Sequence, residues 1–198
     1  MSNTARLRDF VINATKLVDQ HGRDEAALLT AITPLVAALV AVDDWLPEAF
    51  AKPDAQYYRQ YLLHADPLER LSVVSFVWGP GQRTPIHDHR VWGVVGVLRG
   101  AELSVSYERG ADGRLIAQPE ARLERGAVAA VSPTIGDIHT IANALADQPS
   151  ISIHVYGGNI GAIHRSVFDA ATGAEKPFIS GYSSQTVPNL WDRSQEGR

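Results

Sequence analysis

Two stretches of the chain decide the fold: Gly81-Gln-Arg-Thr-Pro-Ile-His87-Asp-His89 and, further along, Pro133-Thr-Ile-Gly136-Asp-Ile-His139-Thr-Ile-Ala-Asn143. Side chains alternate between the two faces of an extended segment, so His87 and His89 project from one face and Asp88 from the other. His139 follows a Pro-Gly turn on a later predicted strand and can close a site of three nitrogen ligands. Neutral imidazoles suit Zn, Cu, Fe or Ni, and three ligands leave positions open for substrate or water.

This spacing resembles the two sequence motifs of the cupins. The first motif is matched by Gly81, His87, His89 and Gly100, and the second, with looser spacing, by Gly126, Pro133, Gly136, His139 and Asn143. The resemblance implies a mainly β fold, a double-stranded β-helix or jelly-roll barrel, whose mouth holds the ligand. Cupins usually add a glutamate ligand four residues after the second histidine, where this chain has Gly93. The expected ligand set is therefore three histidines alone.

Length and composition indicate one ordinary globular domain. The chain has 198 residues and a formal net charge of -4, and we expect residues 1–198 to form a single domain, with a helical part over 1–55 and the barrel over 56–198. The charge gives no reason to expect nucleic acid or an anionic membrane as a partner. The sequence contains no cysteine, which excludes disulfides, thiolate metal ligands and Fe–S clusters.

The sequence also bears on location. Its start lacks the apolar region of a signal peptide, and its most apolar run, residues 35–40, is far shorter than the roughly 20 residues that span a bilayer. We therefore expect a soluble, cytoplasmic protein. The sequence leaves the oligomeric state open.

Hydrophobic periodicity predicts helices in the first forty residues. Apolar residues recur at three- and four-residue steps over 7–18, and His21-Gly22 is expected to end that helix. Asp24 is expected to start a second helix whose buried face runs over 28–39. Pro34 should kink this helix or divide it into two shorter ones. A third short helix is predicted over 47–52.

From about residue 57 the sequence is typical of strands and turns. Strands are predicted over residues 71–78, 91–98, 103–107, 127–131 and 150–156. In the last of these, period two places Ser152, His154 and Tyr156 on one face. That face either points to solvent, with Ile151, Ile153 and Val155 in a core, or lines the interior of the barrel.

Together these motifs resemble the thiol dioxygenases of the cysteine dioxygenase type. The resemblance is carried by Pro85-Ile-His87-Asp-His89, Gly136-Asp-Ile-His139 and Ser152-Ile-His154-Val-Tyr156, and by the missing glutamate at Gly93. It implies Fe(II) held by His87, His89 and His139, with a Ser152–His154–Tyr156 relay beside it. It also implies that small thiols and O2 are the substrates and that both oxygen atoms go onto sulfur, giving a sulfinate.

Two departures concern the substrate. Mammalian cysteine dioxygenases carry, at the place of Gly93, a cysteine that cross-links to the relay tyrosine, so Tyr156 must here be a free phenol. Cysteine-specific enzymes have arginine where Gln60 aligns, and Gln60 resembles the bacterial branch that prefers 3-mercaptopropionate. Arg59 should face away on a strand and cannot replace that arginine. The bacterial branch has an arginine at a matching distance after the relay, so the resemblance implies Arg165 as the partner of the substrate carboxylate.

Three alternatives remain open from the sequence. They are a dioxygenase for L-cysteine or another thiol acid, a non-catalytic cupin that binds a small molecule, and a Zn or Mn cupin enzyme such as an isomerase. The apolar walls of the site are predicted to include Trp78, Trp92, Val94 and Phe168. His164 is predicted to be structural, and His21 and His64 receive no role.

Overall fold

The computed structural model describes residues 4–193, and two helices form the start of this part. Helix α1 (Thr4–His21) ends at the predicted His21-Gly22 pair. Helix α2 (Glu25–Val40) follows Asp24, whose side chain accepts a hydrogen bond of 3.0 Å from the Ala27 amide. This is the N-cap arrangement, which satisfies an amide that has no partner inside the helix.

Two helix predictions need correction. Helix α2 continues through Pro34 without dividing into two helices, so of the two alternatives for Pro34 the division is wrong, and the kink stays a prediction. The predicted helix over 47–52 is a single 3-10 turn, η1 (Glu48–Phe50).

Eleven strands in residues 4–193 form the rest of the molecule. They are β1 (Arg59–Ala65), β2 (Ser72–Trp78), β3 (Gly93–Arg99), β4 (Ala101–Arg109), β5 (Leu115–Ala117), β6 (Ala121–Glu124), β7 (Val128–Val131), β8 (His139–Asn143), β9 (Ser150–Tyr156), β10 (Arg165–Phe168) and β11 (Glu175–Phe178). One antiparallel sheet has the order β1-β2-β9-β3-β7, while β4 pairs with β5, β6 and β8 opposite it, and β10 pairs with β11. The mainly β, double-stranded β-helix fold with N-terminal helices is confirmed.

The central strands β2 and β9 are buried on both faces. On β9 the outward face carries Ile151, Ile153 and Val155, which join the core beneath the helices. The other face carries Ser152, His154 and Tyr156, all buried. Their side chains therefore line the barrel interior, and the alternative in which this polar face meets solvent is wrong.

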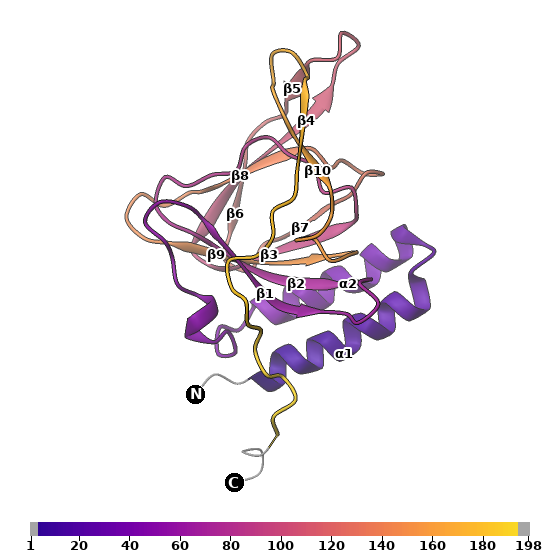
Figure 1. Cartoon of the computed structure of the whole chain (residues 1–198), viewed down its shortest axis with the longest axis vertical. Helices are drawn as coiled ribbons and strands as arrows, with labels where there is room; N and C mark the ends of the chain where they lie inside the picture. Colours follow the sequence, from indigo (N-terminus) through magenta and orange to yellow (C-terminus); the bar gives the residue numbers. More distant parts are fainter. Residues whose placement is uncertain (1–3, 194–198) are drawn as a thin grey trace.

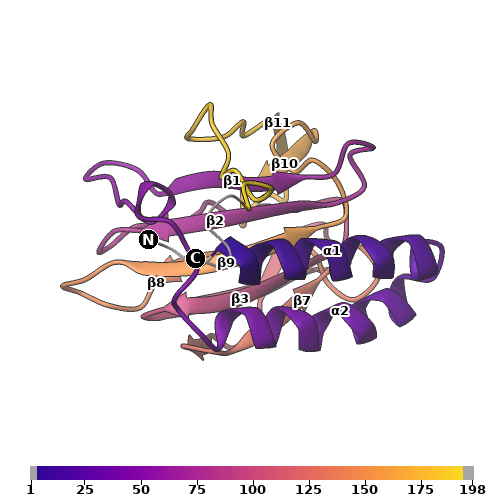
Figure 2. The ribbon, with the colours of Figure 1, turned by 90° about the horizontal axis from the view of Figure 1, so that it is seen from below.

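Both helices cover the outer side of the five-stranded sheet (Figures 1 and 2). Close approach of α2 to β3 requires Gly96, because a Cβ atom there would lie 2.9 Å from Val40 Cγ1 and 3.0 Å from Val36 Cγ1. The helices thus close the outer face of the sheet, and the inner face is left for the site. Within the part of the chain that the structure describes, neither helix has the length and apolarity needed to cross a membrane.

Candidate metal centre

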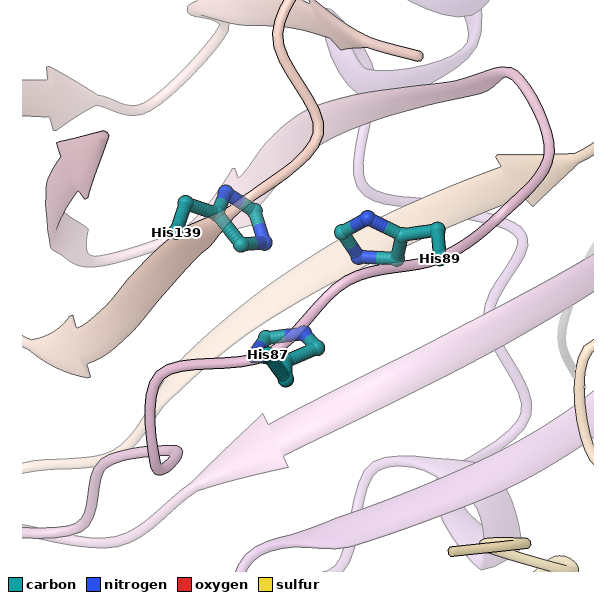
Figure 3. A group of neighbouring side chains, drawn as sticks. All are labelled: His87, His89 and His139. Carbon is teal, nitrogen blue, oxygen red and sulfur yellow. The ribbon is translucent and has the colours of Figure 1, made fainter. Parts of the chain in front are cut away.

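The three predicted histidines meet inside the barrel. One ring nitrogen from each of His87, His89 and His139 lies within 4.8 Å of the others, and the three rings face a common centre in Figure 3. All three residues are buried. The segment that carries His87 is fixed to β8, because the His87 amide donates to the His139 carbonyl (3.1 Å) and the His139 amide to the His87 carbonyl (3.0 Å).

Hydrogen bonds select which nitrogen of the His87 and His89 rings faces the centre. His87 Nδ1 lies 3.1 Å from the Pro85 carbonyl, and His89 Nδ1 lies 2.8 Å from Asp137 Oδ1. Both partners are acceptors, so each Nδ1 carries the proton and each Nε2 keeps its lone pair. The Nε2 atoms of His89 and His139 are buried and have no hydrogen-bond partner. Buried unpartnered nitrogens of this kind are what a metal ion satisfies.

Burial also keeps these histidines neutral. It lowers the pKa of His87 to about 3, with the neighbouring His89 as the next cause, and it lowers the pKa of His139 well below its ordinary value. A neutral imidazole is the form that binds a metal. The donor set therefore fits a divalent ion such as Fe(II), although three histidines alone also suit zinc or nickel.

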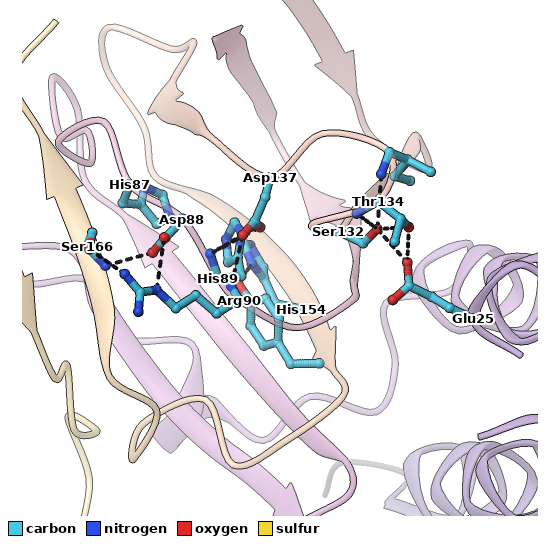
Figure 4. A network of polar contacts seen from close by, with 12 residues as sticks. Glu25, His87, Asp88, His89, Arg90, Ser132, Thr134, Asp137, His154 and Ser166 are labelled. Carbon is cyan, nitrogen blue, oxygen red and sulfur yellow. Dashed lines mark hydrogen bonds and ion pairs between the residues drawn. The ribbon is translucent and has the colours of Figure 1, made fainter. Parts of the chain in front are cut away.

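Aspartates support the site from both sides, as Figure 4 shows. Asp137 accepts hydrogen bonds from the backbone amides of His89 and Arg90 as well as from the His89 ring. Asp88 points the other way, as predicted, and accepts from the Ser166 amide (2.7 Å) and from Arg90 Nε (3.1 Å). These contacts fix the His87-Asp88-His89 segment on both of its faces.

The relay residues form a continuous hydrogen-bonded chain. Ser152 Oγ lies 2.8 Å from His154 Nε2, and His154 Nδ1 lies 2.7 Å from the Tyr156 hydroxyl. Trp78 Nε1 donates to Ser152 Oγ at 3.2 Å. The Tyr156 ring stacks on the His89 ring with centroids 5.3 Å apart, so the chain ends beside the metal centre. Burial raises the pKa of Tyr156, which keeps its phenol protonated.

The place of the missing glutamate is filled by the Tyr156 ring. A Cβ atom built on Gly93 would lie 2.8 Å from Tyr156 Cδ1 and 2.9 Å from Cε1. Glycine at this position therefore lets the phenol pack directly against β3.

A cavity of about 250 Å³ opens beside these groups. Its apolar and aromatic lining comes from Tyr58, Phe76, Trp78, Pro85, Ile141, Val167, Pro177 and Phe178. Of the predicted wall residues, only Trp78 is among them. Val94 belongs to the core under the helices and Trp92 packs against that core, whereas Phe168 lies under the Arg109 guanidinium. The prediction placed Val94 on the wrong face of its strand. Gly93 and Val95 lie on the inner face, so Val94 between them points outward to the helices.

Arg165 and Gln60 both reach the cavity. The Arg165 guanidinium is buried, donates to Ser180 Oγ at 2.6 Å and lies 4.7 Å above the Phe178 ring. Its Nε has no partner. The Gln60 amide donates to the Gly181 carbonyl. Arg59 faces away, as predicted, and pairs with Asp54.

The other predicted histidines lie outside this group. His64 is half-buried on β1, and both His21 and His164 lie away from the three-histidine cluster, with His164 exposed. No role in the centre follows for any of them.

Sequence reasoning missed three polar groups: one that holds the His89 ring, one that lines the cavity and one buried on β4. Asp137 lies in the second motif, two residues before His139. Two residues apart on an extended segment, both side chains are expected on the same face, and this spacing could have indicated that Asp137 belongs to the site. Lys176 lines the cavity from β11, a strand without a recognisable motif. Glu102 is fully buried on β4, one residue before the strand predicted over 103–107.

Several solved structures of other proteins are similar to this chain. Similar solved structures include a protein from Thermus thermophilus (22% identity, TM-score 0.42, covering 56% of this chain and 92% of that one) and an uncharacterised double-stranded β-helix protein from Klebsiella pneumoniae (20%, 0.44, 61% and 95%). An RmlC-like cupin from Desulfovibrio desulfuricans is also similar (22%, 0.40, 59% and 97%).

The family comparison covers most of the chain. The model of cysteine dioxygenase type I matches residues 6–169, a range that contains every member of the three-histidine centre and of the relay. The match and the centre together support a thiol dioxygenase with a non-heme metal. The chain belongs to the cysteine dioxygenase type I family.

Proposed function

We propose that the protein is an Fe(II) thiol dioxygenase that converts a small thiol carboxylic acid to its sulfinate, with 3-mercaptopropionate preferred over L-cysteine. The observation that carries the proposal is Arg165, a buried cation beside the cavity that forms no ion pair with a carboxylate of residues 4–193. An unpaired charge is costly to bury. A carboxylate ligand would supply the missing partner through a strong charge-assisted bond.

The cavity also favours a substrate without an ammonium group. None of the residues that line it is an aspartate or glutamate, whereas Arg165 and Lys176 both contribute positive charge. The ammonium of L-cysteine would therefore meet two cations and no carboxylate. Gln60, held by the Gly181 carbonyl, adds neither charge. These features support 3-mercaptopropionate, which carries the thiol and the carboxylate but no amine.

His87, His89 and His139 would hold the iron through Nε2. When bound, Fe(II) would lower the pKa of a substrate thiol, so that sulfur binds as thiolate, and would activate O2 for transfer to that sulfur. Asp137 keeps the His89 ring in the tautomer that presents Nε2. The aromatic lining, with Phe76 and Trp78, limits water in the cavity.

The relay residues position one proton beside the three-histidine centre. Tyr156 holds its hydroxyl at 2.7 Å from His154 Nδ1, next to the His89 ring. His154 orients the phenol, and Ser152 holds the other side of the His154 ring through Nε2. From this place the Tyr156 hydroxyl can hydrogen-bond the substrate carboxylate or an oxygen atom during transfer.

Oxygen uptake by Fe(II)-loaded protein tests the proposal, with 3-mercaptopropionate and L-cysteine compared under the same conditions and the sulfinate product quantified. We expect kcat/KM to favour 3-mercaptopropionate by about tenfold or more, equivalent to about 1.4 kcal/mol. A preference for L-cysteine would refute the substrate assignment and leave the iron chemistry intact. No uptake with either thiol would favour the non-catalytic cupin.

A further inference from the structure

Glu102 is a buried acid that the proposed mechanism does not use. Its side chain is completely shielded from solvent, and neither carboxylate oxygen has a partner with full hydrogen-bond geometry. The hydroxyl of Ser150 is likewise buried and unpartnered. Three orphaned polar atoms in one interior place require an explanation, because native interiors rarely leave such groups unpaired.

The surroundings of Glu102 favour a neutral carboxylic acid. Its nearby polar groups are Ser150 and Ser152 on β9 and Trp78 on β2, which stabilise the charged form only in part, and burial raises its pKa to about 8. Asn143, opposite on β8, directs its amide nitrogen to the carbonyls of Trp78 and Gln148 instead.

Within residues 4–193, the structure shows no ion pair that supplies a charge to Glu102. Leu123 lies opposite it on β6 and is apolar. Among residues 4–193, no lysine or arginine forms an ion pair with this carboxyl or contributes to its pKa. A proton is therefore the simplest counter-charge, and Ser150 can donate to the remaining carbonyl oxygen.

We propose that Glu102 is a fourth member of the relay, a positioning residue whose protonation state sets the direction of every hydrogen bond from Ser152 to Tyr156. The inference rests on the proposed function only for its catalytic consequence. Its structural basis is the complete burial of two unpartnered Glu102 oxygens in the neighbourhood of Ser152, the residue that begins the chain to Tyr156.

When Glu102 is protonated, all the hydrogen bonds of the chain are donated in the direction of Tyr156. Glu102 donates to Ser152, the Ser152 hydroxyl donates to His154 Nε2, and His154 Nδ1–H donates to the Tyr156 oxygen. Tyr156 then directs its own proton into the cavity. Ser152 also accepts from Trp78 in this arrangement, so its one donor and two acceptor sites are all used.

When Glu102 is ionised, the direction of these hydrogen bonds is reversed. Ser152 then donates to the carboxylate and accepts from His154 Nε2–H, and His154 Nδ1 accepts the Tyr156 proton. Trp78 still donates to Ser152, so every site of the hydroxyl is again used. In this state Tyr156 offers the cavity only its oxygen lone pairs. Loss of one proton from Glu102 thus changes Tyr156 from donor to acceptor without moving any heavy atom.

The tautomer of His154 reports this reversal without any turnover. We would record long-range ¹H–¹⁵N spectra of ¹⁵N-histidine-labelled protein, metal-free and loaded with diamagnetic Zn(II), from about pH 6 to pH 10, with His154 assigned through His154→Gln. We expect the protonated nitrogen to change from Nδ1 to Nε2 through a single transition near pH 8, the pKa of Glu102. In Glu102→Gln, which is isosteric and cannot ionise, the transition should disappear.

Two controls complete the test. Glu108→Gln removes an exposed carboxylate from the same strand and should keep the transition, and Ser152→Ala should uncouple His154 from Glu102 and abolish it. A His154 tautomer that is constant in the wild type, or a transition that survives in Glu102→Gln, would overturn the inference. Failure of thiol oxidation would leave these spectra unchanged, so it would refute the proposed function alone.

Discussion

Replacement of Arg165 by methionine should weaken binding of thiol acids while leaving the metal centre in place. Methionine keeps much of the apolar stem that packs on Phe178 but removes the guanidinium that reaches the cavity. A hydrogen bond to a charged group contributes about 1.5–3 kcal/mol. At about 1.36 kcal/mol per factor of ten, the expected rise in KM for 3-mercaptopropionate is about 10- to 150-fold.

The assay is steady-state oxygen uptake with paired substrates. Cysteamine has a thiol and an ammonium but no carboxylate, so if Arg165 acts as a carboxylate anchor its KM should not rise, and it should fall where loss of the Arg165 charge relieves repulsion of the ammonium. Arg165→Lys keeps the charge and loses the bidentate geometry, and should give an intermediate KM. Arg59→Met is the matched control, because Arg59 pairs with Asp54 outside the cavity.

The reasoning would be refuted by an equal loss for both thiols, which would show that Arg165 supports the fold of the site instead of binding the carboxylate. An unchanged KM for 3-mercaptopropionate would equally exclude the anchor. Iron content measured on every variant separates these results from loss of metal. Lys176, which lines the same cavity, provides a second cation, so the effect should fall toward the lower end of the range.

Four further predictions follow from the site. Asp137→Asn should lower metal affinity by about 10- to 100-fold in chelator competition, because the His89 ring loses its charged acceptor. Tyr156→Phe should keep the iron but lower kcat and increase the O2 consumed per sulfinate formed. Gly93→Ala should cost about 1–3 kcal/mol in denaturant unfolding, because the new Cβ would collide with the Tyr156 ring. Metal-free protein should lose stability as pH falls below about 6.5, the pKa of histidine in the unfolded chain. Below this pH the unfolded chain binds a proton at His87, whereas burial keeps His87 neutral in the folded protein down to about pH 3. At pH 5 this residue alone should lower the free energy of unfolding by about 2 kcal/mol.

Each of these has a contrary result. Unchanged metal affinity in the Asp137 variant would remove it from the site, and unchanged kinetics in the Tyr156 variant would remove the relay from the mechanism. Wild-type stability of Gly93→Ala would mean that the tyrosine can move freely. A metal-free protein equally stable at pH 5 and pH 7 would contradict the burial of neutral His87.

The three-histidine group could be predicted because it depends on local rules. Alternation along an extended segment places His87 and His89 together, and the turn before His139 brings a later strand beside them. The same rule predicted that Asp88 and Arg59 point away from the site, and the helix limits at His21 and Asp24 followed from equally local signals.

The remaining groups depend on contacts that alternation does not specify. Period two places Val94 and Gly93 on opposite faces of β3 but does not say which face is inside. The prediction chose the wrong one for Val94. Asp137 reaches the His89 ring and Lys176 reaches the cavity from segments far apart in the sequence, and the burial of Glu102 depends on the pairing of β4; only the three-dimensional structure defines these contacts.

Strand β9 shows how one alternating sequence serves both stability and chemistry. Its outer residues, among them Ile153, pack beneath the helices, while His154 and its neighbours of the inner face form the relay. Since both faces are buried, neither set can shift by one residue without placing polar groups in the apolar core. The pairing register of β9 that keeps its apolar residues in the core therefore also places Tyr156 beside the three-histidine centre. A substitution such as Ile153→Val should then affect unfolding free energy more than turnover, and Ser152→Ala the reverse.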